Sequence, residues 1–272
     1  MRMAHHAPTI ALVRPTATTP ISVTGAACAL DCAHCGGRYL EHMHPISEAQ
    51  PDGARSLLIS GGCDARGRVP VHGHLEAIAR LRPGRRLNWH LGLVEEADLD
   101  GLAPLVDVVS FDIVGDAETA RQVYGLDATL DDYVETLRLL RGLAPVVPHV
   151  TIGLHGGQIR GERAALEALA AEGVERVILI VFIPTPGTRY ADCAPPPLDE
   201  VADLLAHARC LLPQAGLYLG CMRPHGRYRQ QLDELAVACG LNLIVNPTRA
   251  AERAAQAAGL TVTWGDECCA LY

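Results

Sequence analysis

Lysine is absent from this chain of 272 residues, and all 23 of its basic side chains are arginines. Chemistry that forms a Schiff base on a lysine amine is therefore excluded. The formal charge of −8 argues against broad binding to nucleic acid, which relies on a dense basic surface to neutralise phosphates. Two local arginine clusters do not offset this charge: Arg80, Arg82, Arg85 and Arg86, and Arg223, Arg227 and Arg229.

Long hydrophobic runs are also missing. No apolar stretch approaches the ~20 residues that a membrane span needs. The segment from Met1 to His6 lacks the apolar core of a signal peptide. Ten cysteines are too few for a disulfide scaffold, which favours a reducing compartment. We therefore expect a cytoplasmic protein that contacts neither membrane nor nucleic acid.

Eight short runs rich in Val, Ile and Leu alternate with stretches of helical period rich in Ala, Leu and Glu. This alternation predicts an α/β fold, a (β/α)8 TIM-type barrel over 19–260, after an N-terminal extension (1–18) and before a cysteine-bearing C-terminal tail (261–272). The predicted strands are 21–24, 57–60, 87–90, 106–111, 146–152, 176–183, 216–221 and 242–245. The predicted helices are 73–81, 95–103, 131–140, 162–171, 199–211, 228–238 and 249–257.

A cysteine triplet follows the first predicted strand, in the segment Cys28-Ala-Leu-Asp-Cys32-Ala-His-Cys35. Gaps of three and two residues suit a [4Fe–4S] cluster in which one iron is left open for a substrate or cofactor. Zinc is the main alternative, although structural zinc sites usually combine two separated CxxC-type pairs. His34 lies between two of the cysteines, and we expect it to pack beneath the cluster.

The triplet resembles the CxxxCxxC signature of radical S-adenosylmethionine (SAM) enzymes. In that family, SAM binds the open iron of a [4Fe–4S] cluster and is cleaved to a 5′-deoxyadenosyl radical. Ser60-Gly61-Gly62 resembles the family's glycine turn at the SAM amino group, with Cys63 where a glutamate is common. The segment from Pro184 to Thr188 resembles the PxPGT segment of biotin synthase, and the resemblance covers most of the chain.

Residues at the carboxyl ends of the predicted strands are expected to meet at one face of a barrel. Ser110 and Asp112 share a strand face there, and the resemblance to biotin synthase assigns Asp112 to a SAM ribose hydroxyl. A helix N-cap or turn role is the alternative for Asp112. Asn88 and His90 share the face of the preceding strand and are expected to contact SAM or substrate, unless His90 is a core residue.

The loop after the fifth predicted strand is expected to contact adenine. Its Gly157-Gln-Ile159-Arg-Gly161 segment resembles the first half of a GxIxGxxE pattern of radical SAM enzymes. Glu162 comes too early for that pattern and Ala164 takes the glutamate position, so no acid is assigned. The resemblance also places Pro186 and Gly187 at the SAM site.

A second group of cysteines suggests an auxiliary iron–sulfur cluster. Cys221 and Arg223 are expected to share a face of the seventh predicted strand, in a region where the resemblance to biotin synthase implies an arginine that helps to hold a sulfur-donating cluster. Cys268 and Cys269 in the tail are expected to add thiolates, with Cys63 as a further candidate. Cys221 and Cys63 have a simpler alternative as buried packing residues, a role we also expect for Cys210 and Cys239. Cys193 stays unassigned.

Within the biotin synthase-like group, three short segments look most like archaeal-type, two-protein lipoyl synthases: Glu-Cys-Cys near the end, Gly-Cys-Met-Arg-Pro, and Gly-Gly-Arg-Tyr-Leu after the triplet. That resemblance implies a sulfurtransferase with Cys221, Arg223 and His90 at its catalytic centre. The implied partners are an octanoylated carrier protein, a ferredoxin or flavodoxin reductant and a second radical SAM protein. The alternatives are cofactor assembly by carbon-skeleton or methylation chemistry, and a non-catalytic redox sensor.

Overall fold

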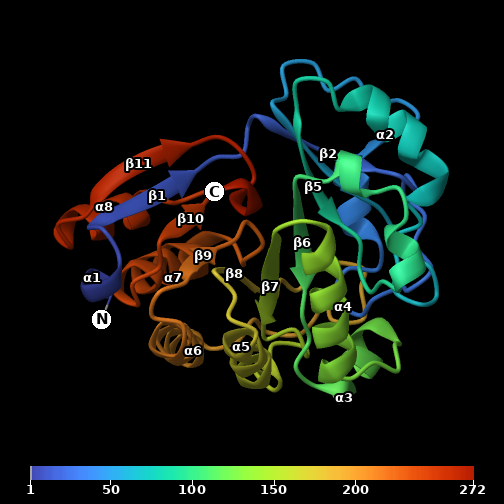
Figure 1. Cartoon of the computed structure of the whole chain (residues 1–272). Coiled ribbons are helices and arrows are strands. Elements are labelled where there is room, and N and C mark those ends of the chain that lie inside the picture. The colour runs from blue at the N-terminus through green and yellow to red at the C-terminus, as the bar shows by residue number, and fades with distance from the viewer. Residues whose placement is uncertain (1) are drawn as a thin grey trace.

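The computed structural model describes residues 2–272 as one sheet of parallel strands that curls into a half-barrel, with helices packed on its outer face (Figure 1). The strand order is β11-β1-β10-β9-β8-β7-β6-β5-β4-β2-β3. The strands are β1 (Thr9–Val13), β2 (Thr18–Ser22), β3 (His44–Pro45), β4 (Ser56–Ser60), β5 (Arg86–His90), β6 (Val108–Asp112), β7 (Val146–Ile152), β8 (Arg176–Val181), β9 (Gly216–Leu219), β10 (Leu243–Val245) and β11 (Thr261–Gly265).

The helices follow the strands in the expected alternation. They are α1 (Arg2–His5), α2 (Leu75–Leu81), α3 (Ala117–Thr119), α4 (Leu130–Leu143), α5 (Glu162–Ala171), α6 (Leu198–Leu211), α7 (Gly226–Ala238) and α8 (Arg249–Ala257). Within residues 2–272 no helix is long and apolar enough to cross a membrane.

The α/β fold with a barrel-like curl is confirmed, and each of the eight predicted strands has its counterpart in β2 and β4–β10. The sheet is open rather than closed, because within residues 2–272 β3 and β11 each pair on one side only. Three strands were not predicted: β1, β3 and β11. β11 is mostly exposed, so it lacks the apolar pattern that reveals a buried strand.

The helix predicted over 95–103 is wrong. The chain forms two short 3-10 turns instead, Glu96–Leu99 and Ala103–Leu105. Gly101 has a φ of 73° and Pro104 lacks an amide hydrogen, so a continuous helix cannot run through this stretch.

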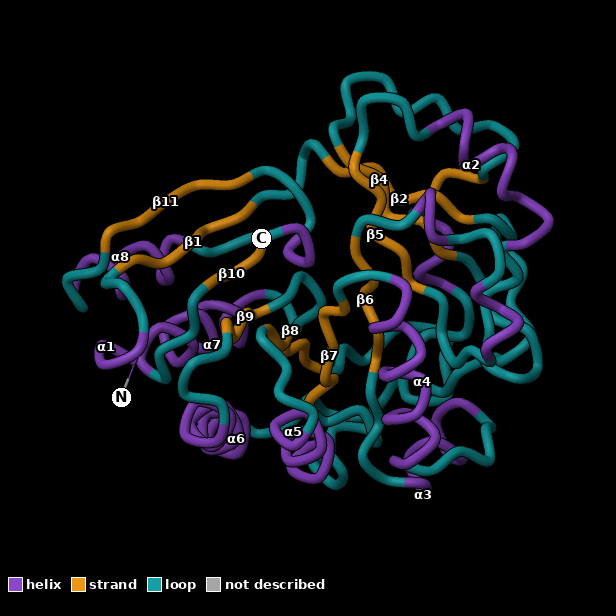
Figure 2. Tube along the Cα trace, in the orientation of Figure 1, coloured by secondary structure: helices purple, strands orange, loops and turns teal. Residues whose placement is uncertain are grey.

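Strand alternation divides the side chains of the sheet between two apolar layers. On β6, Val109 and Phe111 face the helices, where Phe111 packs against Tyr133 of α4 with ring centroids 6.2 Å apart. On the opposite, concave face lies a smaller cluster that includes Val108, Val147 and Ile178. Cys269 and Ala270, from the 3-10 turn Cys269–Leu271, belong to this inner cluster. The chain end therefore lies inside the curl, which we call the lumen (Figure 2).

Candidate active site

The cysteine loop, residues 28–35, leaves β2 and is held by segments that are distant in sequence. The amide of Ala33 donates to Val123 O at 2.7 Å, and Ala33 O accepts from the Tyr190 amide at 3.0 Å. The amide of Ala29 donates to Cys63 O at 2.8 Å. These contacts fasten the loop to the segments after β4, β6 and β8, so the triplet lies over the carboxyl ends of the strands.

The thiols of the triplet gather in one place. The Cys32 thiol donates a hydrogen bond to Cys35, which lowers the pKa of Cys35 and raises that of Cys32. The charge of Cys28 also raises the pKa of Cys32, so the three side chains lie close together. Burial raises the pKa of Cys63 to about 12, with smaller contributions from Cys28, Asp64 and Asp112. Cys63 is thus a neighbour of the triplet.

The donor set fits an iron–sulfur cluster. Three thiols from a loop of eight residues are soft ligands, and a hydrogen bond already favours a thiolate at Cys35. Among residues 2–272, no three His, Cys, Asp or Glu side chains converge on a point that would hold a single metal ion. The cysteines of a cluster bind different irons, so convergence on one point is not needed for it.

His34 packs between two aromatic rings, as expected. Its ring meets those of Tyr39 and Tyr124 edge-on, with centroids 6.0 Å and 5.6 Å away. Burial lowers the pKa of His34 to about 4, so the imidazole is neutral near pH 7. Within the cysteine loop, His34 is therefore a neutral packing residue.

The glycine turn after β4 is pressed against the cysteine loop. A Cβ atom at Gly62 would lie 2.0 Å from Ala27 O and 2.6 Å from Cys28 Cβ, so only glycine fits there. The Gly62 amide donates to Thr24 Oγ1 at 2.7 Å, and the Ser60 hydroxyl donates to His90 O at 3.1 Å. The structure thus gives Gly62 a role in seating the cysteine loop, in addition to the SAM contact expected from the sequence.

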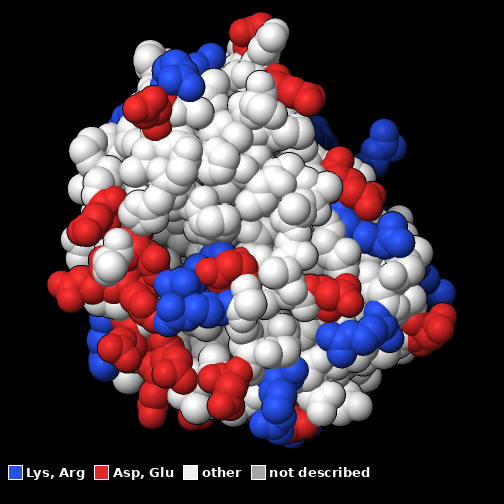
Figure 3. Space-filling model, turned by 90° about the vertical axis from the view of Figure 1, so that its right-hand side faces the viewer, with Lys and Arg blue, Asp and Glu red and all other residues white. Residues whose placement is uncertain are grey.

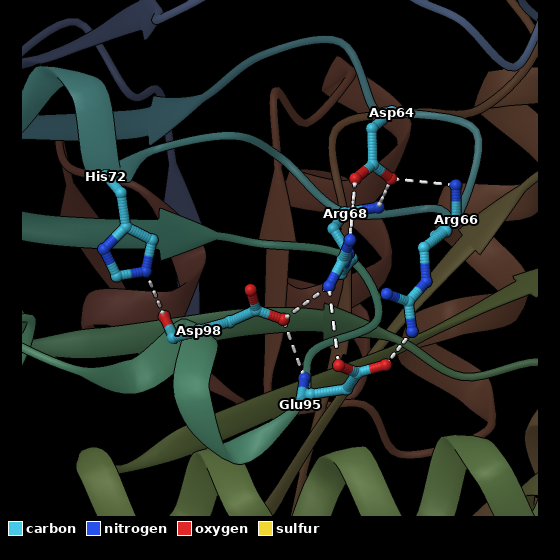
Figure 4. Close-up of polar contacts among 6 residues, drawn as sticks. All are labelled: Asp64, Arg66, Arg68, His72, Glu95 and Asp98. Carbon is cyan, nitrogen blue, oxygen red and sulfur yellow. Dashed lines mark hydrogen bonds and ion pairs between the residues drawn. The ribbon is translucent and has the colours of Figure 1, made fainter.

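Charged side chains brace the two loops that follow β4 and β5 (Figure 4). Arg68 contacts the carboxylates of Asp64 at 3.2 Å and Asp98 at 3.3 Å, and Asp98 accepts from the Glu95 amide at 2.9 Å. His72 contacts Asp98 O at 3.0 Å. This side of the molecule carries acidic and basic groups interspersed around a broad uncharged area (Figure 3). Each charge of the network has a partner, so its role is to fix the loop beside the glycine turn.

Asp112 lies at the carboxyl end of β6 and pairs with His90 of β5. His90 Nε2 is 3.3 Å from Asp112 Oδ2. Desolvation alone would raise the pKa of Asp112, but His90, with smaller contributions from His149 and His34, outweighs it and lowers this pKa to about 2. Asp112 is therefore ionised. The N-cap role that we considered for it belongs to Asp116, which accepts from the amides of Glu118 and Thr119.

His149 of β7 is a lumen residue that the sequence analysis missed. Its charge interacts with Asp112 and His90, and burial lowers the pKa of His149 to about 4. Its Nδ1 contacts Val147 O at 3.0 Å. Strand alternation would have found it, because β7 pairs His149 with Asp112 of β6.

The loop expected to contact adenine is shaped by Glu162. Its buried carboxylate accepts from the Gly153 amide at 2.7 Å and the Arg160 amide at 2.6 Å. Gly157, with a φ of 90°, has no room for a side chain because Ala194 O would lie 2.0 Å away. Ile159 packs on the main core cluster. Glu162 therefore supports the backbone of this loop, a role that the family pattern did not indicate.

The segment from Pro184 to Thr188 docks beside the cysteine loop. The Thr185 hydroxyl lies 3.2 Å from the Tyr39 hydroxyl, and Thr188 Oγ1 donates to Thr185 O at 2.8 Å. Gly187 has a φ of 77°, and the Arg38 guanidinium lies where a Cβ would be. Pro186 and Gly187 themselves stay exposed.

In the second group of cysteines, Cys268 and Cys269 pack in the inner cluster of the lumen, and Cys221 is an exposed residue beyond the end of β9. The protein around Cys221 raises the pKa of its thiol by desolvation, and the charge of Cys268 is the next contributor. The Cys269 thiol donates to Cys268, lowering the pKa of Cys268 and raising that of Cys269. Cys63 contributes to neither shift, because it lies with the first triplet. The second group therefore consists of Cys221, Cys268 and Cys269.

Arg223 is displaced from the role we expected. Its side chain is fully buried, and its guanidinium lies 2.9 Å from Asp233 Oδ1 of α7. It also donates to Gly220 O at 2.7 Å and Asn246 O at 3.2 Å. Because β9 ends at Leu219, strand alternation does not extend to Cys221 and Arg223. Arg223 joins the sheet to α7 and is not available as a cluster ligand.

The remaining cysteines are scattered. Cys239 packs in part, with its thiol 3.6 Å from Ala202 O, as expected. Cys210 is exposed on α6, so the packing role predicted for it is wrong. Cys193 is half-buried near Gly156.

The chain resembles a known enzyme in sequence. No family model matches the chain. The chain is 27% identical over 245 residues to the biotin synthase of Bordetella avium (strain 197N), and the alignment covers 82% of this chain and 74% of that protein. The sequence of this chain is thus similar to that of a biotin synthase along most of its length.

The structural neighbours share the fold at low identity. The crystal structure of methylornithine synthase (PylB) matches with a TM-score of 0.67 at 13% identity, over 96% of this chain and 86% of that one. HydG, a maturase of the [FeFe]-hydrogenase, matches with a TM-score of 0.67 at 14% identity, over 90% of this chain and 58% of that one. SuiB of Streptococcus suis bound to S-adenosylmethionine gives 0.54 at 13%, over 83% and 55%.

Proposed function

We propose that this chain is a radical SAM enzyme that removes hydrogen from an unactivated carbon. The observation that carries the proposal is the fit of Gly62 against Cys28, because it joins the cysteine loop and the glycine turn in one unit. When bound, a [4Fe–4S] cluster and SAM would together supply a 5′-deoxyadenosyl radical as the hydrogen acceptor. Cys28, Cys32 and Cys35 would hold the cluster.

The residues around this unit suit a bound nucleoside and amino acid. Gly61 and Gly62 would receive the amino group of SAM, and Ser110 and Asp112 the ribose. Gly157, Ile159, Pro186 and Gly187 would border the adenine. The ionised Asp112 can accept hydrogen bonds from hydroxyl groups, and His90 fixes its orientation. Tyr39 and Tyr124, packed on His34, would limit the access of water from the cysteine side.

Sulfur insertion is the reaction we favour, in the manner of a lipoyl synthase acting on an octanoyl group of a carrier protein. It is supported by the thiols of Cys221, Cys268 and Cys269, which form a group separate from the triplet. A substrate carbon between the two groups would face the hydrogen acceptor on one side and a sulfur source on the other. A ferredoxin or flavodoxin would serve as reductant. A second radical SAM protein would take part in the same sulfur insertion.

Anaerobic reconstitution tests the proposal in two steps. The parental protein with SAM and dithionite should release 5′-deoxyadenosine, and Cys32→Ala should abolish the release. Cys210→Ala, at an exposed cysteine outside both groups, is the matched control and should retain it. Release of 5′-deoxyadenosine by Cys32→Ala at the parental rate would contradict the proposal. If neither the parental protein nor Cys210→Ala released 5′-deoxyadenosine, a non-catalytic redox sensor would be favoured.

The second step examines the product. An octanoylated carrier protein should gain sulfur, detected by mass spectrometry of the intact carrier. Release of 5′-deoxyadenosine with no sulfur in any product would leave the radical chemistry standing. It would favour cofactor assembly by carbon-skeleton or methylation chemistry.

A further inference from the structure

Strand β11 leaves one edge of the sheet without a partner strand. It pairs with β1 alone, and in Figure 1 it lies at the outer margin of the sheet. Its first and last residues bond to the segment that contains β1, because the Thr261 amide donates at 2.8 Å and the Gly265 carbonyl accepts at 2.9 Å. Since these groups alternate in direction along a strand, the amides and carbonyls of Val262 and Trp264 point away from β1. A further strand would bind at these two residues.

The free edge of β11 lacks the features that usually prevent such binding. Edge strands of soluble proteins are commonly blocked by charged side chains, prolines or bulges. The segment Thr261-Val-Thr-Trp-Gly265 contains no charged residue and no proline, and it pairs with β1 in an unbroken register. All five of its residues are exposed or half-buried. The edge is therefore open to another strand.

Two aromatic side chains flank this edge, and they are the exposed large hydrophobic residues of the described chain. Trp264 is 51% exposed and Tyr272 is 37% exposed. Trp264 is in register with Leu12 of the main core, so its indole lies on the helix face of the sheet. The Tyr272 hydroxyl occupies the position that a Cβ of Gly265 would take, on the lumen face that Gly265 shares with Val13. The edge thus has an aromatic ring on each face.

The indole of Trp264 is held in one position. Arg14 lies over it, with the guanidinium carbon 4.6 Å from the ring centroid, and the same guanidinium is 3.9 Å from a carboxylate oxygen of Glu252 on α8. A side chain that is already ordered loses less conformational entropy when it binds. Tryptophan and arginine are also among the residues that contribute most to binding at protein interfaces. These contacts favour a protein partner for this edge.

We propose that β11 pairs with β11 of a second copy of this chain, in an antiparallel arrangement centred on Thr263. An antiparallel pair of identical strands has two-fold symmetry, so the same surface serves both copies. This register sets Val262 of each copy opposite Trp264 of the other. Both residues present a free amide and a free carbonyl, so each Val262–Trp264 pair exchanges two backbone hydrogen bonds.

The side chains suit the same register. Val262 packs on the main core beside Trp264, so the pairing brings a β-branched side chain against an indole twice, on the helix face of the joined sheet. Thr263 meets its own copy at the symmetry axis, and Thr–Thr pairs also stabilise antiparallel strands. A register centred on Trp264 would instead set Val262 opposite the charged Asp266, beyond the end of β11. The sequence of the edge is therefore complementary to itself in one register.

Analytical ultracentrifugation of the full chain at increasing concentration measures the association. Two short strands form a small contact, so we expect a weak, reversible equilibrium between the chain of 29.0 kDa and a species of twice that mass. Val262→Pro should shift the protein to the monomer, because it removes an amide that faces the partner. Val262→Thr keeps this amide and is the matched control, which should still associate. A parental protein that stays monomeric at every concentration would overturn the proposal.

A second variant guards against a failure of folding. Proline is tolerated in an edge strand where its nitrogen faces solvent, so Val262→Pro should keep its circular dichroism spectrum and most of its thermal stability. Trp264→Glu leaves the backbone groups of β11 in place but sets a carboxylate at the edge, and it should also abolish association. Undiminished association of both folded variants would show that the copies meet through another surface and would contradict the proposal.

The fluorescence of Trp264 reports the contact directly. The chain has two tryptophans, and the other, Trp89, is fully buried. The indole of Trp264 should lose water when Val262 of the partner packs against it, so the emission maximum should move to shorter wavelength as the protein concentration rises. Trp264→Phe should remove this shift. Association without any shift in the parental protein would place Trp264 outside the interface and refute the proposed register.

Discussion

The amide of Cys268 donates a 2.8 Å hydrogen bond to Thr18 Oγ1, which joins the C-terminal segment to β2 across the lumen. Three further contacts also join the C-terminal segment to the sheet. Asp266 pairs with Arg55, Glu267 pairs with Arg86, and Arg176 donates to Tyr272 O. Residues 266–272 therefore bridge strands that no backbone ladder joins, and they form a floor for the lumen.

We expect these ion pairs to hold the floor in place. Replacing both Arg55 and Arg86 with glutamine should leave the sheet folded but loosen the tail, because exposed ion pairs add little to global stability. The loosened tail should expose Cys269, so that its iodoacetamide labelling rises several-fold. Arg80→Gln, an exposed arginine of α2, is the control and should leave the labelling unchanged. Equal labelling in all three proteins would show that the ion pairs do not hold the floor.

Gly62→Ala should damage the cysteine loop directly. The new Cβ would lie 2.0 Å from Ala27 O, a backbone atom that cannot move without displacing Cys28. We expect iron content to fall sharply even when SAM is omitted, and stability to fall by about 1–3 kcal/mol, as is usual for overpacking. Gly142→Ala meets nothing within 4 Å and should behave as the parental protein. Full iron content with weakened SAM binding alone would indicate that the loop tolerates the change.

Asp112→Asn should weaken SAM binding by roughly tenfold or more, since a hydrogen bond to a charged group contributes about 1.5–3 kcal/mol. Calorimetry on reconstituted protein measures the affinity. His90→Gln removes the partner of Asp112 and should weaken binding less, because the carboxylate stays charged. Unchanged affinity in Asp112→Asn would place the ribose elsewhere.

The stability of cluster-free protein should depend on His149 below neutral pH. Burial lowers the pKa of His149 from 6.5 to about 4, so between these values the unfolded chain binds more protons than the folded one. The contribution of His149 is therefore fully present above pH 6.5 and is lost as pH falls toward 4. The raised pKa of His90 works in the opposite direction.

Urea unfolding at pH 7 and pH 5 isolates this effect when the parental protein is compared with His149→Gln. The variant should lose less stability between the two pH values than the parental protein does. His34 shares the lowered pKa, so part of the acid sensitivity should persist. Identical pH dependence in the two proteins would show that His149 does not stay neutral in the fold.

Much of this architecture could be predicted from the sequence, because buried parallel strands are recognised as runs of Val, Ile and Leu. The curl could not be predicted as open or closed. Whether a sheet closes depends on its edge strands, and β11 is too exposed to show a buried pattern while β3 has only two residues. The spacing of the cysteine triplet and the strand face of Asp112 could be predicted from the sequence because both are local features.

The errors at the site have a common physical cause. The position of Arg223 was inferred by alternation beyond Leu219, where the strand has already ended. Glu162 and Asn88 act through partners distant in sequence, the amide of Gly153 and the thiol of Cys268. Such pairings are decided by tertiary packing, which no local spacing reports.

The place of β1 in the sheet constrains the order in which this protein can fold. β1 lies between β10 and β11, so its two neighbours are made about 230 and 250 residues after it on the ribosome. The segment from Thr9 to Val13 must wait unpaired while β2 and β4–β9 can already assemble. Loop closure over such separations is slow. The half of the sheet next to the tail should therefore form last, after synthesis has passed β11.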